Sequence, residues 1–193
     1  MASLAKLAEA ICDPEYRDIP EVARQALLEM VEQIDTLSVR IERLDRDILT
    51  CVKEDETARR LTTIPGVGPI IAATVRAAVH DAHGFRTGRD FAAWTGLAPR
   101  AHSSGGKERL GSITKMGNRY LRKLLVSGAC SVVFRCKRHQ DALRHWADQL
   151  LGRKRQGAGG FKFVAVALAN KIARIIFAVL ASGRAYEPRV IAG

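Results

Sequence analysis

Hydrophobic residues recur at alternating steps of three and four in the first third of the chain. They lie within IPEVARQALLEMVEQIDTLSVRIERLDRDILTC, at Leu27, Met30, Ile34, Leu37, Ile41, Leu44, Ile48 and Cys51. This spacing is that of the a and d positions which form the seam between packed helices. It predicts one long helix, opened by Pro20 at a first-turn position. Two interpretations stay open: dimerisation through the seam, or a helix folded back on its own domain.

Beyond residue 60 the apolar positions predict several shorter helices. One is expected around Asp90 to Thr95, with Trp94 packed into the core, and Asn118 can cap the helix RYLRKLLVSGACSVVFRC. Two more are expected at roughly 140–151 and 161–180. Because no alternating strand pattern is present, we predict an all-α chain. Its expected parts are a helical arm at 1–60, a compact domain at 61–183 and a tail at 184–193.

The segment LTTIPGVGPIIAATVRAAV has the pattern of a helix-hairpin-helix. Gly66 and Gly68 would allow a tight turn and bring backbone N–H groups to a helix N-terminus, where a phosphate oxygen is favoured. This predicts DNA binding through the backbone, independent of DNA sequence. A plain helical hairpin without that role is the alternative.

The net charge of +11 comes from one segment of the chain. Residues 100–155 hold 14 Lys and Arg against 3 Asp and Glu. Residues 1–60, in contrast, are net acidic, with 9 Lys and Arg against 14 Asp and Glu. Such a concentrated excess is the usual footprint of a polyanion-binding surface. In the helix after Asn118, leucines and valines are expected to face inward. The predicted outward phosphate contacts in and before this helix are Lys115, Arg119, Arg122 and Lys123.

The segment RAHSSGGKERLG combines a histidine, two serines and several cations. A serine can attack phosphorus if a base removes its proton and cations stabilise the transition state. His102 is a possible base for Ser103 or Ser104, and the glycines at 105 and 106 would allow close approach. Taken alone, the residues favour an ordinary loop, because Ser-Gly pairs are mostly found in loops. The candidate cations are Arg100, Lys107 and Arg109.

Several classes of protein are disfavoured by composition. Cys12, Cys51, Cys130 and Cys136 form no CxxC pair, so neither a zinc site nor a disulfide framework is indicated. The start of the chain lacks the pattern of a signal peptide. The apolar run FKFVAVALANKIARIIFAVLASG is interrupted by charged residues and predicts a buried core helix rather than a membrane span. We therefore expect a cytoplasmic protein without membrane partners.

The blocks IPGVGPIIAATV and FRTGRDFAAWTGLAPRAHSSGGKERLGSITKMGNRYLRKLLVSGA resemble the C-terminal transposase domain of DEDD insertion-sequence transposases. The resemblance is to the IS110 family, and within it to the IS1111 group, from about residue 24 to residue 180. It implies a serine directly before a glycine that becomes joined to a DNA strand end, which corresponds to Ser104, with Ser103 as the neighbouring alternative. It also implies DNA and a structured guide RNA as partners.

The family's N-terminal RuvC-like domain, with its acidic metal site, has no counterpart in this sequence. We therefore expect no metal site in this chain, and Mg2+ only together with that acidic domain. The chain alone is expected to be inactive. The alternatives are a non-catalytic DNA- or RNA-binding and dimerisation module and a repair-type hairpin protein, against which the SSGGK block argues.

Overall fold

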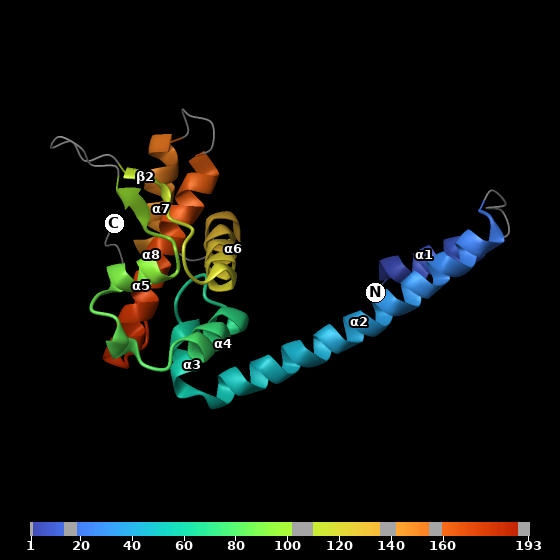
Figure 1. Ribbon diagram of the computed structural model, residues 1–193, viewed down its shortest axis with the longest axis horizontal. Helices are drawn as coiled ribbons and strands as arrows, with labels where there is room; N and C mark the ends of the chain where they lie inside the picture. Colours follow the sequence, from blue (N-terminus) through green and yellow to red (C-terminus); the bar gives the residue numbers. More distant parts are fainter. Residues whose placement is uncertain (1, 14–18, 102–109, 136–141, 155–159, 189–193) are drawn as a thin grey trace. The chain divides into compact units, whose positions relative to one another are not determined.

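The structure is a computed structural model that describes residues 2–13, 19–101, 110–135, 142–154 and 160–188. It divides into two compact units, Met1–Thr50 and Cys51–Gly193. The division lies before residue 60, which falls within the second unit. Helices make up most of the described part, in agreement with the all-α prediction (Figure 1).

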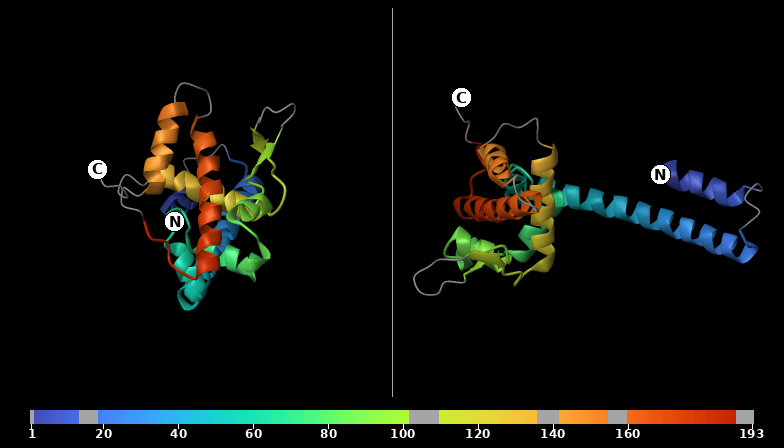
Figure 2. Two further views of the ribbon diagram at one scale, coloured as in Figure 1. Left: turned by 90° about the vertical axis from the view of Figure 1, so that its left-hand side faces the viewer. Right: turned by 90° about the horizontal axis from the view of Figure 1, so that it is seen from above.

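The first unit consists of α1 (Ala2–Cys12) and most of α2 (Glu21–Glu54). The long predicted helix is confirmed, and it begins directly after Pro20, whose carbonyl oxygen accepts a hydrogen bond from the Arg24 N–H at 3.0 Å. Helix α1 runs back alongside the first part of α2 (Figures 1 and 2). Ile11 is buried, and Leu28 and Val31 of α2 are half-buried.

The predicted seam lies on a different side of α2 and stays exposed. Its side chains from Leu27 to Leu44 are between 39% and 59% exposed. Helix α1 therefore leaves the seam uncovered, and the apolar stripe remains available for another helix.

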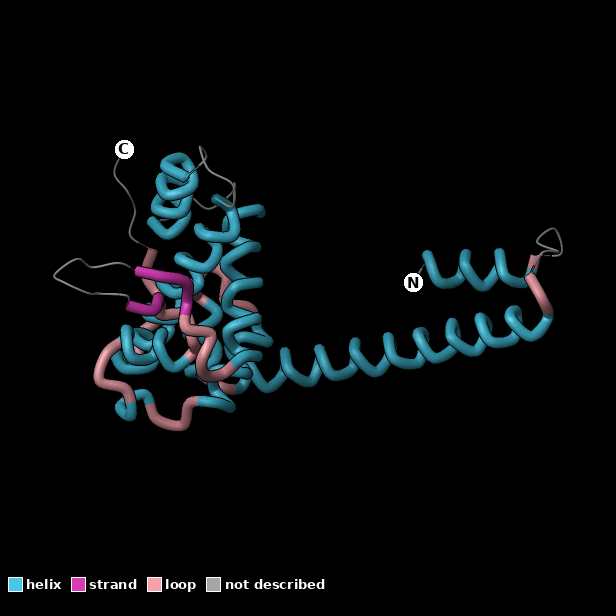
Figure 3. Tube along the Cα trace, turned by 45° about the horizontal axis from the view of Figure 1, so that its top comes forward, coloured by secondary structure: helices cyan, strands magenta, loops and turns pink. Residues whose placement is uncertain are grey.

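The second unit is built around α8 (Gly160–Ser182), whose buried face carries eight core residues from Val164 to Val179. Helices α3, α5, α6 and α7 and the short turn η1 all contact α8, and α4 contacts α3 and α6 (Figures 1 and 3). The bounds of these surrounding elements are α3 Glu56–Thr62, α4 Pro69–Ala78, η1 Ala82–Gly84, α5 Gly88–Trp94, α6 Arg119–Arg135 and α7 Ala142–Lys154.

Helix α8 is also the one helix in the described ranges that is long and apolar enough to span a membrane. Its most apolar 18-residue window is 44% buried inside the protein. Contacts with its neighbouring helices account for its apolar composition, and the predicted core helix is confirmed.

Two features of the second unit sharpen or correct the sequence predictions. Helix α5 is capped by the Thr87 hydroxyl, and Trp94 packs in an aromatic cluster with Phe85 and Phe91, with ring centroids 5.4 and 5.5 Å away. The structure adds a small antiparallel ribbon that the sequence did not predict, formed by β1 (Pro99–Ala101) and β2 (Leu110–Ile113). Strands of three and four residues are too short to show an alternating pattern.

Candidate nucleic-acid interface

The glycine-containing turn joins α3 to α4 and rests directly on α6. Gly66 has a φ of +84°, a left-handed conformation that favours glycine. A Cβ atom there would lie 2.8 Å from Val132 Cγ2, and a Cβ atom at Gly128 would lie 2.0 Å from the Gly66 carbonyl oxygen. Gly66 is thus required by the fold itself. The partner glycine, Gly128, was not predicted, although a glycine inside a helical pattern is a signal for close packing.

Gly68 differs from Gly66, since nothing in the fold requires glycine there. It is the N-cap of α4, with φ −86° and ψ 175°, and provides no side-chain cap. A Cβ atom at Gly68 would meet no described atom within 4 Å. The first N–H groups of a helix have no partner within the helix and carry partial positive charge. In α4 these donors are at Ile70 and Ile71, because Pro69 has none.

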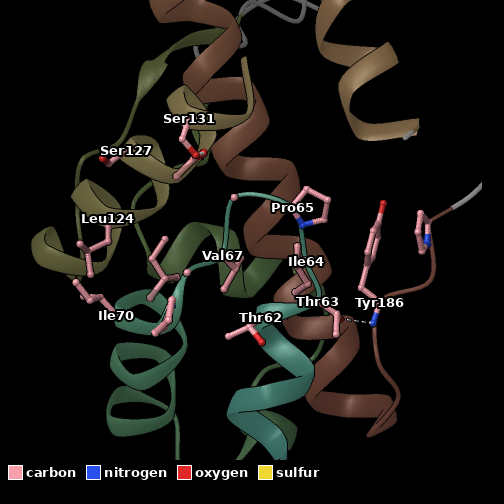
Figure 4. A pocket seen from close by; sticks show the side chains of 16 residues that line it. Thr62, Thr63, Ile64, Pro65, Val67, Ile70, Leu124, Ser127, Ser131 and Tyr186 are labelled. Atoms are coloured by element: carbon pink, nitrogen blue, oxygen red, sulfur yellow. Dashed lines mark hydrogen bonds between the residues drawn. The ribbon is translucent and has the colours of Figure 1, made fainter. Parts of the chain in front are cut away.

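A shallow pocket surrounds this turn (Figure 4). The turn from Ile64 to Ile70 lies between Ser127 and Ser131 of α6 and Tyr186, which follows α8. The Tyr186 N–H donates to Thr63 Oγ1 at 2.9 Å. None of the described residues that line the pocket is charged, so an anion there would depend on N–H and hydroxyl donors.

One ion pair connects α3 to α4. Asp55 caps α3 by accepting from the Ala58 N–H at 3.0 Å, and its other oxygen accepts from Arg76 Nε of α4 at 2.8 Å. The hydrogen bond from Arg76 lowers the pKa of the Asp55 carboxyl below its usual value, against the opposing effect of burial. The pair therefore links the two helices and keeps the carboxylate charged to a lower pH than usual. That α3, the glycine turn and α4 form a helix-hairpin-helix that binds DNA stays a prediction.

The predicted catalytic residues His102, Ser103 and Ser104 lie outside the described residues, as do Lys107 and Arg109. The structure does describe both ends of this segment. Ala101 pairs with Leu110 at the end of the ribbon, so the segment begins and ends at adjacent backbone positions. Arg100 on β1 is exposed, and its Nη2 donates to the Thr114 carbonyl oxygen at 3.2 Å.

The base of the ribbon is held by close backbone contact between two loops. Gly96 and Gly117 have φ values of +75° and +95°, and a Cβ atom at Gly117 would lie 1.9 Å from the Trp94 carbonyl oxygen. Lys115 donates its N–H to the Gly96 carbonyl oxygen at 3.1 Å and has a φ of +58°. A non-glycine residue with positive φ is uncommon, and here it is held by neighbouring contacts while its side chain is exposed.

Helix α6 carries three of the predicted phosphate contacts, and the structure separates them. Asn118 Oδ1 accepts from the Leu121 N–H at 3.0 Å, which confirms the predicted cap. Arg119 and Lys123 are exposed. Arg122, expected to face outward, is instead half-buried, and its Nη1 donates to the Thr95 carbonyl oxygen at 3.1 Å. The reason is that the α5–β1 loop packs over this position and presents its carbonyl groups to the guanidinium.

The exposed cations at this end of the domain form no ion pair with another described side chain. Within the described ranges, none of the ion pairs includes Arg100, Lys115, Arg119 or Lys123. Helix α6 also contributes Leu124 and Ser127 to the pocket at the α4 N-terminus. Exposed cations and helix N–H donors therefore lie on adjacent elements. Groups of these kinds bind phosphates and can position DNA without reading its sequence.

Comparison with known proteins points to one family. Residues 58–145 match the model of the Transposase IS116/IS110/IS902 family. A probable family 20 transposase of Pseudomonas aeruginosa is 44% identical over 97% of this chain and 54% of its own length. A putative transposase of Sinorhizobium fredii is 41% identical over 97% and 47%. The transposase for insertion sequence element IS1328 of Yersinia enterocolitica is 36% identical over 90% and 51%.

The chain thus spans about half the length of these curated relatives. The family match includes the glycine turn, the ribbon and α6. The chain therefore belongs to the IS116/IS110/IS902 transposase family, with the family's domain in residues 58–145.

Proposed function

We propose that this chain is the serine-bearing, DNA-binding part of a transposase that acts in DNA transposition. The observation that carries the proposal is the coincidence of the family match with the exposed cations of α6 and the open α4 N-terminus. In this proposal a DNA duplex lies along these elements through its phosphates. Arg119 and Lys123 contact the backbone, and the α4 N–H groups bind one further phosphate.

Ser104 is the proposed nucleophile, with Ser103 as the neighbouring alternative. Its Oγ forms a bond to phosphorus, the bond from phosphorus to one sugar oxygen breaks, and that sugar oxygen leaves with a proton. His102 is the proposed acceptor of the serine proton. Arg100, Lys107 and Arg109 are proposed to stabilise the charge that develops on the phosphate oxygens.

Magnesium belongs in this proposal to the family's acidic domain. Among the described residues, no group of three or more His, Cys, Asp or Glu side chains is placed to hold a metal ion. The described residues thus offer no magnesium site, and the steps proposed for this chain use its own serine and cations. The wider proposal includes a structured guide RNA, a homo-oligomer formed through α2, and a cytoplasmic location.

Gly68 offers a direct test of phosphate binding at α4. Its backbone conformation suits any residue, and asparagine and aspartate are both good N-caps, so Gly68→Asn and Gly68→Asp should both fold. The two variants differ mainly in charge. Either side chain can accept from one of the α4 N–H groups, so we expect Gly68→Asn to weaken duplex affinity slightly. Gly68→Asp also repels the phosphate and should bind about tenfold more weakly than Gly68→Asn, a difference of about 1.4 kcal/mol.

The measurement is fluorescence anisotropy of a labelled duplex across a range of salt concentrations. Binding of the unmodified chain should fall steeply with salt, because phosphate contacts release counterions. Equal affinity of the Asp and Asn variants would rule out a phosphate at α4. Salt-independent binding, or none at low salt, would contradict the duplex proposal as a whole.

A further inference from the structure

A second surface of the same unit lies between the ribbon and α8, away from the α3–α4 turn. We call it the ribbon groove. Its principal residues are Ser112 and Ile113 of β2 and Val166, Lys171, Arg174 and Ile175 of α8. The duplex proposal above does not use this groove.

The described lining of the ribbon groove carries several cations and no acidic residue. Arg89, Lys162, Lys171 and Arg174 all line it, and no Asp or Glu is among its described lining residues. None of these four cations takes part in the ion pairs found within the described ranges. A concave surface with cations of one sign concentrates anions.

Two of these cations, Lys171 and Arg174, lie about one turn apart on α8. Lys171 is half-buried, and its Nζ lies 4.4 Å from the centroid of the Trp146 ring. Burial lowers the pKa of the Lys171 ammonium, and the positive charge of Arg174 lowers it further. A bound anion would relieve this repulsion. The backbone beside them is well fixed, because Asn170 Nδ2 donates to the Leu97 carbonyl oxygen at 3.0 Å.

The remaining wall of the groove is apolar. Val166 and Ile175 of α8 face the groove together with Ile113 of the ribbon. A duplex presents phosphates on its outside and keeps its base faces stacked. Its base faces therefore cannot pack against an apolar wall. An unpaired strand exposes both phosphates and base faces, and proteins that bind such strands combine a cationic groove with apolar or aromatic contacts.

We infer that the ribbon groove binds an unpaired stretch of nucleic acid, with Lys171 and Arg174 on its phosphates and the apolar wall against its bases. This inference rests on the proposed function, because it assigns one more nucleic-acid contact to the same domain. Single-stranded DNA and single-stranded RNA share the chemistry that the groove recognises.

The test compares three labelled ligands by fluorescence anisotropy: oligo-dT and oligo-rU of about 12 nucleotides, and a duplex of the same length. The groove variant is Lys171→Met with Arg174→Met. The matched control is Lys53→Met with Arg59→Met, which removes two exposed cations that line neither the pocket nor the groove. The stronger of the two single-strand ligands identifies the type of strand.

We expect the groove variant to bind the preferred single strand about tenfold more weakly, with a salt slope lower by about 0.7 for each cation that contacted a phosphate. Its duplex affinity should match that of the control variant. Its melting temperature should change little, because relief of the repulsion between the two charges offsets the lost contact of Lys171 with the Trp146 ring.

A measurement on the unmodified chain guards against misfolded variants. An iodouridine-containing strand, photo-cross-linked to the protein, should attach to peptides from α8 or to the peptide that contains Trp146. Cross-links confined to α3 and α4, or equal loss of single-strand and duplex binding in the groove variant, would overturn the inference. So would a change of oligomeric state in that variant, which would make the groove a protein interface.

The outcomes separate this inference from the proposed function. If the duplex results at Gly68 come out as expected while the groove variant binds single strands normally, only the groove inference fails. If the unmodified chain binds neither the single strands nor the duplex at low salt, both the proposed function and the groove inference fail.

Discussion

Gly128 shows how much a single residue decides in this domain. It lies in the middle of α6, where alanine would normally be preferred, yet the Gly66 carbonyl oxygen occupies the place of a side chain. The contact brings the α3–α4 turn against α6 and thereby places the open end of α4 beside the exposed cations of that helix. Gly68, two residues further along the turn, is free of this restriction and is the residue at which binding can be tested without disturbing packing.

We predict that Gly128→Ala destabilises the protein by about 1–3 kcal/mol, because a Cβ atom 2.0 Å from a backbone oxygen forces the turn away from α6. Helix propensity alone would favour alanine by about 1 kcal/mol. A loss of stability in Gly128→Ala would therefore show that the contact with the turn outweighs helix propensity. The matched control is Gly152→Ala in α7, where a Cβ atom meets no described atom within 4 Å.

The measurement for both variants is denaturant unfolding followed by circular dichroism. The control should be neutral or slightly more stable than the unmodified chain. If both variants behaved alike, the glycine contact would have no role in stability.

At the scale of elements, the helices were predictable and the ribbon was not. The arm, the core helix and the α6 cap each carry a repeated or local signal, such as the seam of α2 or Asn118 before α6. The ribbon has only a few residues, and it depends on backbone contacts among Gly96, Met116 and Gly117 that are distant in sequence. Arg122 was misassigned for the same reason, because its partner Thr95 is supplied by another loop.

Helix α2 carries the prediction that belongs to this scale. Its seam is exposed in the single chain, and burying such a stripe against a second copy is the usual outcome of an a/d pattern. We expect the purified chain to be at least a dimer at about 50 µM and Ile41→Asp to shift it towards monomer. Static light scattering across a concentration series is the measurement.

Val39 provides the control for this experiment. It is 55% exposed, close to the 57% of Ile41, but lies off the seam. Val39→Asp should therefore leave the oligomer intact. A monomer at every concentration, or equal effects of the two substitutions, would refute assembly through the seam.

For the molecule as a whole, the proposal divides the chemistry between two parts. This chain supplies DNA contacts and the serine segment at the end of the ribbon, and the family's acidic domain supplies the metal-dependent half. The sequence resemblance implies Ser104 as the nucleophile, and residues 102–109 lie outside the described part of the structure. The role of this serine is therefore tested chemically. Loss of electrostatic assistance in such sites costs about two to three orders of magnitude in rate for each missing group.

Covalent capture of DNA is the most direct test of the account. The chain is incubated with a labelled DNA end, alone and with the acidic domain, the guide RNA and magnesium supplied in trans, and adducts are separated by denaturing electrophoresis and mapped by mass spectrometry. We predict binding without an adduct for the chain alone. The complete mixture should give an adduct on Ser104 that Ser104→Ala abolishes and Ser103→Ala retains. An adduct that survives both substitutions together would contradict serine chemistry in this segment, and a complete mixture that binds DNA without any adduct would favour a non-catalytic binding module.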